Sequence, residues 1–248
     1  MRIVNQHLNY PRATLIEPNT KGYIHAAFEV DDSLLPIYFS MSRMKRKLLE
    51  RAKDFAGQLH SREEVTAANV FRAVVRPPLK QPYLESVRDR FHVARYDVVL
   101  LIETRSPETA RSLHAHKDFQ EFLTAAEASV RYRHIFIGKN ARRIQEVDKT
   151  RPGVFLFNYF YAEDARELLP VWEYTAGWFT AETRLDNSTL LMPLEGEPSE
   201  YGVINHCRWD SLPRLMPHLI FKPSLQRYVM ENFTANKIAP MPILYRLA

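Results

Sequence analysis

The chain has little that could brace the fold covalently or insert it into a membrane. Cys207 is the only cysteine among 248 residues, so no intrachain disulfide can form, and we expect a protein of a reducing compartment such as the cytoplasm. No stretch approaches about eighteen uncharged apolar residues, and the amino-terminal segment has no continuous apolar run. We therefore expect neither a membrane span nor an export signal.

Sequence signals for nucleotides, metals and nucleic acids are also missing. The sequence has no glycine-rich phosphate loop, dinucleotide fingerprint or HExxH motif. His114 and His116 stand two residues apart on an expected helix, so they point to different faces and predict no metal site. The net charge of +5 comes from 34 basic and 29 acidic residues that are largely interleaved, which indicates a solvated surface and no nucleic-acid partner.

What the sequence does contain is typical of a globular protein, with 46% hydrophobic residues and only 7 glycines. Helical periodicity in the second half predicts two helical regions, 162–184 and 211–233. The first could end near Gly177, and three prolines must bend or divide the second. Apolar and aromatic runs predict four strands, at 154–161, 189–194, 201–209 and 243–247. The order is βαββαβ, the ferredoxin-like arrangement.

The first half repeats this order, with expected helices at 33–60 and 107–128. Its expected strands are 23–30, 67–75, 96–103 and 130–137. A shift of 106 positions matches the apolar pattern of the two halves and aligns Gln120 with Gln226. We therefore predict an α+β fold of two tandem ferredoxin-like modules. Its expected parts are an arm over one edge at 1–22, a first module at 23–139, a charged linker at 140–153 and a second module at 154–248.

The same shift places a polar cluster opposite an aliphatic strand. Residues 204–208 read Ile-Asn-His-Cys-Arg, whereas residues 98–102 read Val-Val-Leu-Leu-Ile. Burying an imidazole, an amide and a guanidinium costs several kcal/mol unless they are hydrogen-bonded or face a wet cavity. We therefore predict that the second module holds the active site and the first is a scaffold. Alternatively, His206 and Arg208 share one face and merely pair with carboxylates such as Asp210 or Glu173.

Aromatic residues are also concentrated in the second module, which contains all three tryptophans of the chain. They could wall a flat apolar ligand, although such stripes also form ordinary cores. Asp186-Asn187-Ser188 could give the same pocket a polar rim or simply form a turn. The candidate substrate-binding residues are Trp172, Trp178, Trp209, Tyr159, Asn187, Asn205 and His218.

One segment of the second module resembles a known family. Trp209-Asp-Ser-Leu, then His218, Lys222-Pro-Ser-Leu and Tyr228, is similar to the strand-to-helix segment of antibiotic-biosynthesis monooxygenase-type domains, in the dimeric α+β barrel superfamily. The resemblance covers the second module and, more faintly, the first, and proteins of many activities share it. It implies two sheets closed into a barrel with helices outside. Two subunits make this pairing in smaller relatives, and here one chain can make it alone.

The resemblance also implies an activity: a cofactor-independent, monooxygenase-like enzyme acting on a small aromatic or polyketide-like substrate. An Asn on the first strand recurs in the oxygenase members, and Asn158 stands there, although it could instead satisfy a buried backbone group at a bulge. In this hypothesis Asn158 and Arg208 stabilise an enolate or phenolate oxygen, and His206 exchanges the proton. A cyclase, isomerase or decarboxylase would need much the same groups.

Two further hypotheses stay open. Tandem modules of this shape also resemble the chlorite dismutase group, which implies haem as an alternative cofactor with His206 or His218 as its axial candidate. A non-catalytic protein could instead use the aromatic second module to dock a partner. A homo-oligomer is compatible with each hypothesis.

Overall fold

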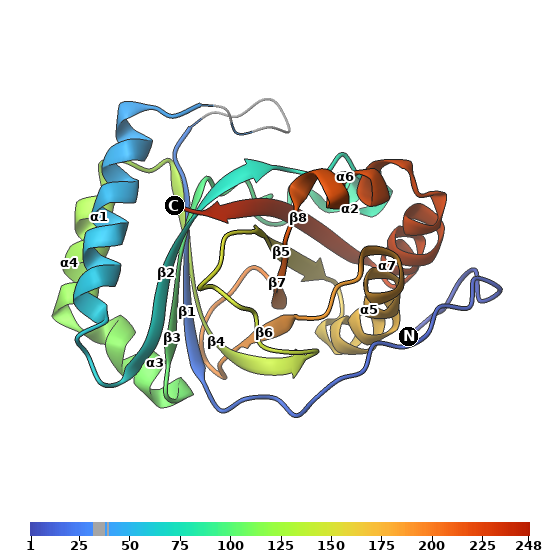
Figure 1. Ribbon diagram of the computed structural model, residues 1–248, viewed down its shortest axis with the longest axis horizontal. Coiled ribbons are helices and arrows are strands. Elements are labelled where there is room, and N and C mark those ends of the chain that lie inside the picture. Colours follow the sequence, from blue (N-terminus) through green and yellow to red (C-terminus); the bar gives the residue numbers. More distant parts are fainter. Residues whose placement is uncertain (32–37, 39) are drawn as a thin grey trace.

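The computed structural model describes residues 1–31, 38 and 40–248. The described strands form one closed antiparallel barrel in the order β1-β3-β2-β8-β5-β7-β6-β4 (Figure 1). The first half contributes β1 (Gly22–Glu29), β2 (Val65–Val75), β3 (Val98–Thr104) and β4 (Tyr132–Arg143). The second half contributes β5 (Val154–Ala162), β6 (Thr189–Pro193), β7 (Val203–Trp209) and β8 (Ile238–Leu247).

Each half supplies four neighbouring strands with the same internal order. The first gives β4-β1-β3-β2 and the second β8-β5-β7-β6, so the third strand of each module lies between its first and second strands. The modules join where β2 pairs with β8 and β4 pairs with β6. This confirms the predicted α+β fold of two ferredoxin-like modules in one chain. Closure of the barrel gives every described strand a neighbour on each side along at least part of its length.

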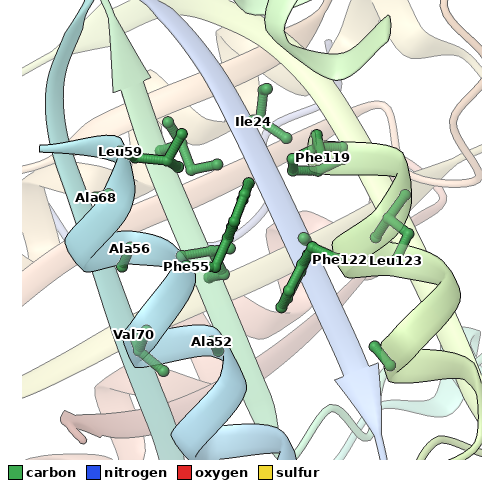
Figure 2. Packing of buried hydrophobic residues seen from close by; sticks show 14 of the residues in the cluster. Ile24, Ala52, Phe55, Ala56, Leu59, Ala68, Val70, Phe119, Phe122 and Leu123 are labelled. Atoms are coloured by element: carbon green, nitrogen blue, oxygen red, sulfur yellow. The ribbon is translucent and has the colours of Figure 1, made fainter. Parts of the chain in front are cut away.

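Helices cover the outer face of each module (Figure 1). Over the first module lie α1 (Arg43–Leu59), α3 (Pro107–Ala115) and α4 (Lys117–Glu127), and α2 (Pro82–Val87) follows β2. Figure 2 shows the side chains of α1 and α4 meeting over the strands, where the rings of Phe55 and Phe122 stack with centroids 4.7 Å apart. Burying such apolar surface contributes about 25 cal/mol per Å².

Two helices of the first module differ from expectation. The structure begins α1 at Arg43, where the Ser42 hydroxyl accepts a hydrogen bond from the Lys45 amide at 3.0 Å. Residues 33–37 and 39 of the helix expected at 33–60 lie outside the described residues. The helix expected at 107–128 is divided at His116, whose extended backbone ends α3 and begins α4.

Two strands are longer than the sequence predicts. Because β4 pairs with β6 up to Arg143, residues 140–143 belong to a strand and not to the expected linker. β8 begins at Ile238 and includes Pro240 and Pro242. Both prolines lie where β8 pairs with β5 alone, since β2 is opposite only residues 244–247. A proline is tolerated there because one side of the strand has no ladder to break.

Over the second module lie α5 (Leu168–Thr183), α6 (Leu212–Phe221), the π-helix η2 (Leu225–Met230) and α7 (Glu231–Ala235), with a short 3-10 turn, Ala165–Glu167, before α5. The expected division of the region 211–233 occurs at Lys222 and Pro223, between α6 and η2. The amino-terminal arm lies on this helical layer: Tyr10 donates to Glu182 on α5 at 2.8 Å, and Ile16 bridges to Arg143 on β4. Among the described residues, no helix is long and apolar enough to cross a membrane.

The helix α5 continues past Gly177, where the sequence suggested that it could end. A Cβ atom there would lie 1.9 Å from the carbonyl oxygen of Pro11, so the glycine allows the amino-terminal arm to pack against the helix.

We expect Gly177→Ala to lower the free energy of unfolding by about 1–3 kcal/mol, because the arm must move. Gly57→Ala on α1 is the matched control. With nothing within 4 Å of its added methyl, it should raise stability by about 0.5–1 kcal/mol. Urea unfolding measures the change in the free energy of unfolding for both variants. An equal loss of stability in both would show that the effect at Gly177 does not come from its contact with the arm.

Candidate active site

Alternation along β5 and β7 places the three predicted catalytic residues on opposite faces of the sheet. Phe157 pairs with His206, and the next pair along the strands is Asn158 with Asn205. The His206 ring stacks on Phe157 inside the barrel, with centroids 4.3 Å apart, whereas Asn158 and Asn205 face the helical layer. The structure therefore does not bring Asn158 together with His206 and Arg208.

His206 is part of the packed barrel interior. Its Nδ1 donates to the carbonyl oxygen of Leu156 at 3.1 Å, and its Nε2 has no hydrogen-bond partner among the residues that the structure describes. Phe71 and Phe155 also contact the ring. Burial lowers the pKa of His206 well below its ordinary value. A neutral imidazole enclosed by aromatic rings acts as core and has no route to a ligand in the helical layer.

The shift of 106 positions gives the wrong correspondence between the residues of β3 and those of β7. It sets His206 opposite Leu100, but Leu100 packs under the helices of the first module, while Val99 and Leu101 face the barrel. Because side chains alternate along a strand, a one-residue error exchanges the two faces. Leu100 therefore cannot occupy the position in β3 that corresponds to His206 in β7. The offset that superposes the inward-facing residues of these two strands is an odd number of residues.

Arg208 lies where β7 leaves the barrel. Its Nη2 donates to the carbonyl oxygen of Pro152 at 2.6 Å and pairs with Asp210 at 2.8 Å. Asn187 holds the Arg208 backbone from both sides, accepting from its amide at 2.8 Å and donating to its carbonyl at 2.9 Å. The alternative prediction of carboxylate pairing therefore holds for Arg208, whose partner is Asp210, but not for His206, which bonds to the Leu156 carbonyl.

An enclosed cavity lies between the outer face of β5 and β7 and the helices above them. It has two lobes of about 30 Å³ each, and Asn158 borders both. The polar lobe is lined by Asn205, Ser188, Thr175, Cys207 and Trp172. The apolar lobe is lined by Leu79, Leu219, Val229, Met230, Pro240 and Leu244. The side chains that join the lobes are Leu156, Phe179, Trp209 and Phe233.

The two amides in this cavity are available to a ligand. Asn158 makes no side-chain hydrogen bond among the described residues, and its Oδ1 is buried. Asn205 accepts from the Ser188 hydroxyl at 2.7 Å. Within the described part of the chain, its NH₂ group donates only to the Cys207 sulfur, at 4.0 Å. Burial raises the pKa of the Cys207 thiol well above its ordinary value, so it stays protonated. The cavity thus offers amide donors in otherwise apolar surroundings.

The aromatic residues predicted to wall a ligand are divided between the cavity, the core under the helices and the barrel interior. Trp172 and Trp209 line the cavity, as an aromatic clamp would. Trp178 is fully buried and donates to the Ser224 hydroxyl at 2.9 Å, so it belongs to the core. Tyr159 faces the barrel, where its hydroxyl lies 3.3 Å from both His25 Nε2 and Tyr245 Oη.

Trp209 also forms the boundary between this cavity and an open cleft of about 860 Å³. Its indole Nε1 donates to the Thr183 hydroxyl at 3.0 Å. The cleft is bordered by three predicted residues, Asn187, Arg208 and His218, and by two arginines that the sequence analysis missed, Arg184 and Arg214. No local pattern indicated these arginines, since only folding brings the ends of α5 and α6 together.

The residues present do not fit haem, the cofactor of the chlorite dismutase alternative. An axial ligand must face an apolar slot that is large enough for the macrocycle. His206 is on the barrel side of β7, and among the described residues no histidine lines the enclosed cavity. His218 borders the open cleft, whose walls are rich in charged groups.

The fold is that of the dimeric α+β barrel proteins, made here within one chain. An anthrone oxidase-like protein has a similar structure, with a TM-score of 0.67, 14% identity, and coverage of 93% of this chain and 92% of that one. A provisionally named monooxygenase from Lactobacillus acidophilus NCFM has a TM-score of 0.52, 7% identity, and coverage of 93% and 94%. A mutant chlorite dismutase from Candidatus Nitrospira defluvii has a TM-score of 0.51, 10% identity, and coverage of 94% and 93%.

No family model matches the sequence, and no curated protein matches it. Likeness at these identities shows a shared fold, which is compatible with monooxygenase-like and haem-binding proteins alike.

Proposed function

We propose that this chain is a cofactor-independent, monooxygenase-like enzyme that oxidises a small aromatic or polyketide-like substrate in the cavity above β5 and β7. One observation carries the proposal: among the described residues, the buried Oδ1 of Asn158 has no hydrogen-bond partner in an enclosed, largely apolar cavity. Leaving such a group unsatisfied costs about 1–3 kcal/mol. A substrate hydroxyl that donates to this oxygen would remove that cost, while the NH₂ group of the same amide donates to a second substrate oxygen. The fold likeness to an anthrone oxidase-like protein supports the substrate class by analogy.

The amides suit a reaction in which negative charge develops on a ring oxygen. An anthrone-type substrate has a methylene group opposite a ring carbonyl, and loss of one methylene proton gives an enolate. The side-chain NH₂ groups of Asn158 and Asn205 would donate to that oxygen, in a cavity that excludes bulk water. Stabilising the anion lowers the pKa of the bound carbon acid, so it ionises more readily.

The reaction balances with dioxygen as the only oxidant. The enolate carbon forms a bond to one oxygen of O₂, and protonation gives a hydroperoxide. Loss of the second methylene proton then breaks the O–O bond, leaving a carbonyl on the substrate and releasing water. One oxygen atom enters the product, the other leaves as water, and the two C–H bonds supply all the electrons.

The cavity provides the oxyanion donors but no general base. Among the described residues, no carboxylate, imidazole or amine lines either lobe. The proton must therefore leave through water or through the substrate's own phenol groups, and His206 has no part in its transfer. This favours substrates that are already acidic, such as hydroxylated anthrones.

Substrate entry requires side chains to move. Each lobe has room for about one or two water molecules, which is less than an aromatic ring. Trp209 lines both lobes and is also part of the cleft wall. Rotation of its ring would open the cavity from the cleft.

Oxidation of 1,8-dihydroxyanthrone by the purified protein tests the proposal. We expect the enzyme to consume one O₂ per quinone formed, well above the protein-free rate. With ¹⁸O₂, one labelled atom should appear in the quinone and one in water. Heat-denatured protein controls for autoxidation. Quinone formation at the protein-free rate for this and related anthrones would contradict the proposal.

A further inference from the structure

The open cleft outside Trp209 is lined by five carboxylates and four arginines, and two of these arginines have no ion-pair partner among the described residues. Its carboxylates are already satisfied by neighbouring side chains. Glu146 pairs with Lys21 and Arg143, Asp148 with Arg151, Glu182 with Lys222 and Asp210 with Arg208, while Asp186 accepts from Asn187. These acidic groups therefore do not need a cationic ligand.

Arg184 and Arg214 differ from those carboxylates. Neither side chain makes an ion pair or hydrogen bond within the described part of the chain, and both border the cleft. Arg184 caps the end of α5 with a φ of 56°, a left-handed conformation that costs energy for a residue other than glycine.

Other donors face the same space. His218 lies one helical turn after Arg214 on α6, so the two share a face. Its Nδ1 is buried, and the Arg208 side chain is only 7% exposed. Neither this Nδ1 nor the Arg208 Nε has a hydrogen-bond partner in the part of the chain that the structure describes. The N-terminus of α6 adds a partial positive charge, since the Ser211 side chain caps none of its amides. Cationic and donor groups from α5, α6 and β7 thus surround one volume.

We propose that this cleft binds the carboxylate of the substrate, so that the substrate is an aromatic or polyketide-like acid. Arginine is suited to a carboxylate because its planar fork can donate two parallel hydrogen bonds. Since Trp209 borders both spaces, the ring passes this side chain into the cavity while the carboxylate stays with Arg184 and Arg214. This inference rests on the proposed function, whose cavity receives the ring.

A pair of non-reacting probes isolates the carboxylate. Anthraquinone-2-carboxylate and 2-(hydroxymethyl)anthraquinone share their ring system and differ in charge. We expect the native protein to bind the acid at least about tenfold more tightly, as calorimetry or quenching of tryptophan fluorescence would measure. Added salt should weaken binding of the acid and leave the alcohol nearly unchanged.

The variant Arg184→Gln/Arg214→Gln should lose about tenfold in affinity for the acid and keep its affinity for the alcohol. The two single variants should each lose part of this preference. Arg88→Gln is the control, because Arg88 is an exposed arginine between α2 and β3, away from the cleft lining. An unchanged preference in the double variant overturns the inference, as does a native protein that binds the acid no better than the alcohol or not at all.

The outcome separates this inference from the proposed function, because the probes do not react. A protein that oxidises anthrones but shows no arginine-dependent preference for the acid keeps the oxygenase proposal and loses the carboxylate site. A protein that binds the acid through these arginines but consumes no O₂ keeps the carboxylate site and loses the oxygenase proposal.

Discussion

Asn158→Ala should lower kcat for anthrone oxidation by about 10²–10³-fold, the usual effect of removing one oxyanion donor. The cause would be the loss of an amide that makes no hydrogen bond to the described residues, so that its NH₂ group is free for the enolate oxygen. Initial rates of O₂ uptake and of quinone formation measure the change. KM should change less than kcat, because the charge that the amide stabilises is greatest in the transition state.

Asn158→Leu distinguishes catalysis from structure. Replacing an unsatisfied buried amide with an apolar side chain of similar size is neutral or stabilising, so this variant should be at least as stable as the native protein while losing activity. A structural role for Asn158 predicts the opposite, a clear fall in Tm.

His206→Leu is the matched control on the other face of the sheet. Its side chain is inside the barrel, so turnover should stay within about twofold of the native protein when the two are compared below their melting transitions. Loss of turnover in this variant, with normal turnover in Asn158→Ala, would move the active site into the barrel.

The free energy of unfolding should fall steeply as the pH drops from about 6.5 toward 4, because three buried histidines occupy the barrel interior. Burial lowers the pKa of His134 to about 4, and it lowers the pKa values of His25 and His206 well below the ordinary value. These imidazoles stay neutral in the folded protein and bind protons once it unfolds. Below about 6.5, the pKa of a histidine in the unfolded chain, added acid therefore favours the unfolded state. Above that pH the histidines are neutral in both states, so they no longer make the free energy of unfolding depend on pH.

Each such histidine adds about 1.4 kcal/mol per pH unit to the slope, or about 4 kcal/mol per pH unit for all three. Urea unfolding at intervals between pH 7.5 and 4.5 gives this slope. His134→Gln should reduce it by about one third. Val99→Ala, which removes interior volume without a titrating group, should lower stability by a similar amount at every pH. A slope that no histidine substitution reduces would exclude this explanation.

Much of the fold could be predicted from local pattern. Strand and helix periods are properties of neighbouring residues, so the βαββαβ order of each half was evident in runs such as 154–161 and 96–103. The missed boundaries have non-local causes. Residues 140–143 extend β4 because β6 lies beside them. Gly177 does not end α5, because its missing side chain instead makes room for the arm.

The candidate site was predicted less well, because successive side chains along a strand lie on opposite faces of the sheet. The sequence indicated that Asn158, His206 and Arg208 were unusual polar residues in apolar strands, but not which of them share a face with the cavity. Their faces depend on the register of β5 and β7 in the closed barrel, where each residue is directed either inward or toward the helices. Asn158 joined Asn205 in the cavity, while His206 joined the aromatic core.

By itself, the sequence determined that the chain is an α+β protein of two similar modules, because composition and periodicity are read within a few residues. Only the tertiary structure decided where ligands could bind. Closing the barrel filled its interior with aromatic rings and left space under α5 and η2, and folding brought Arg184 and Arg214 to one cleft. The physical reason is that a cavity exists only where side chains from distant segments fail to fill the volume between them.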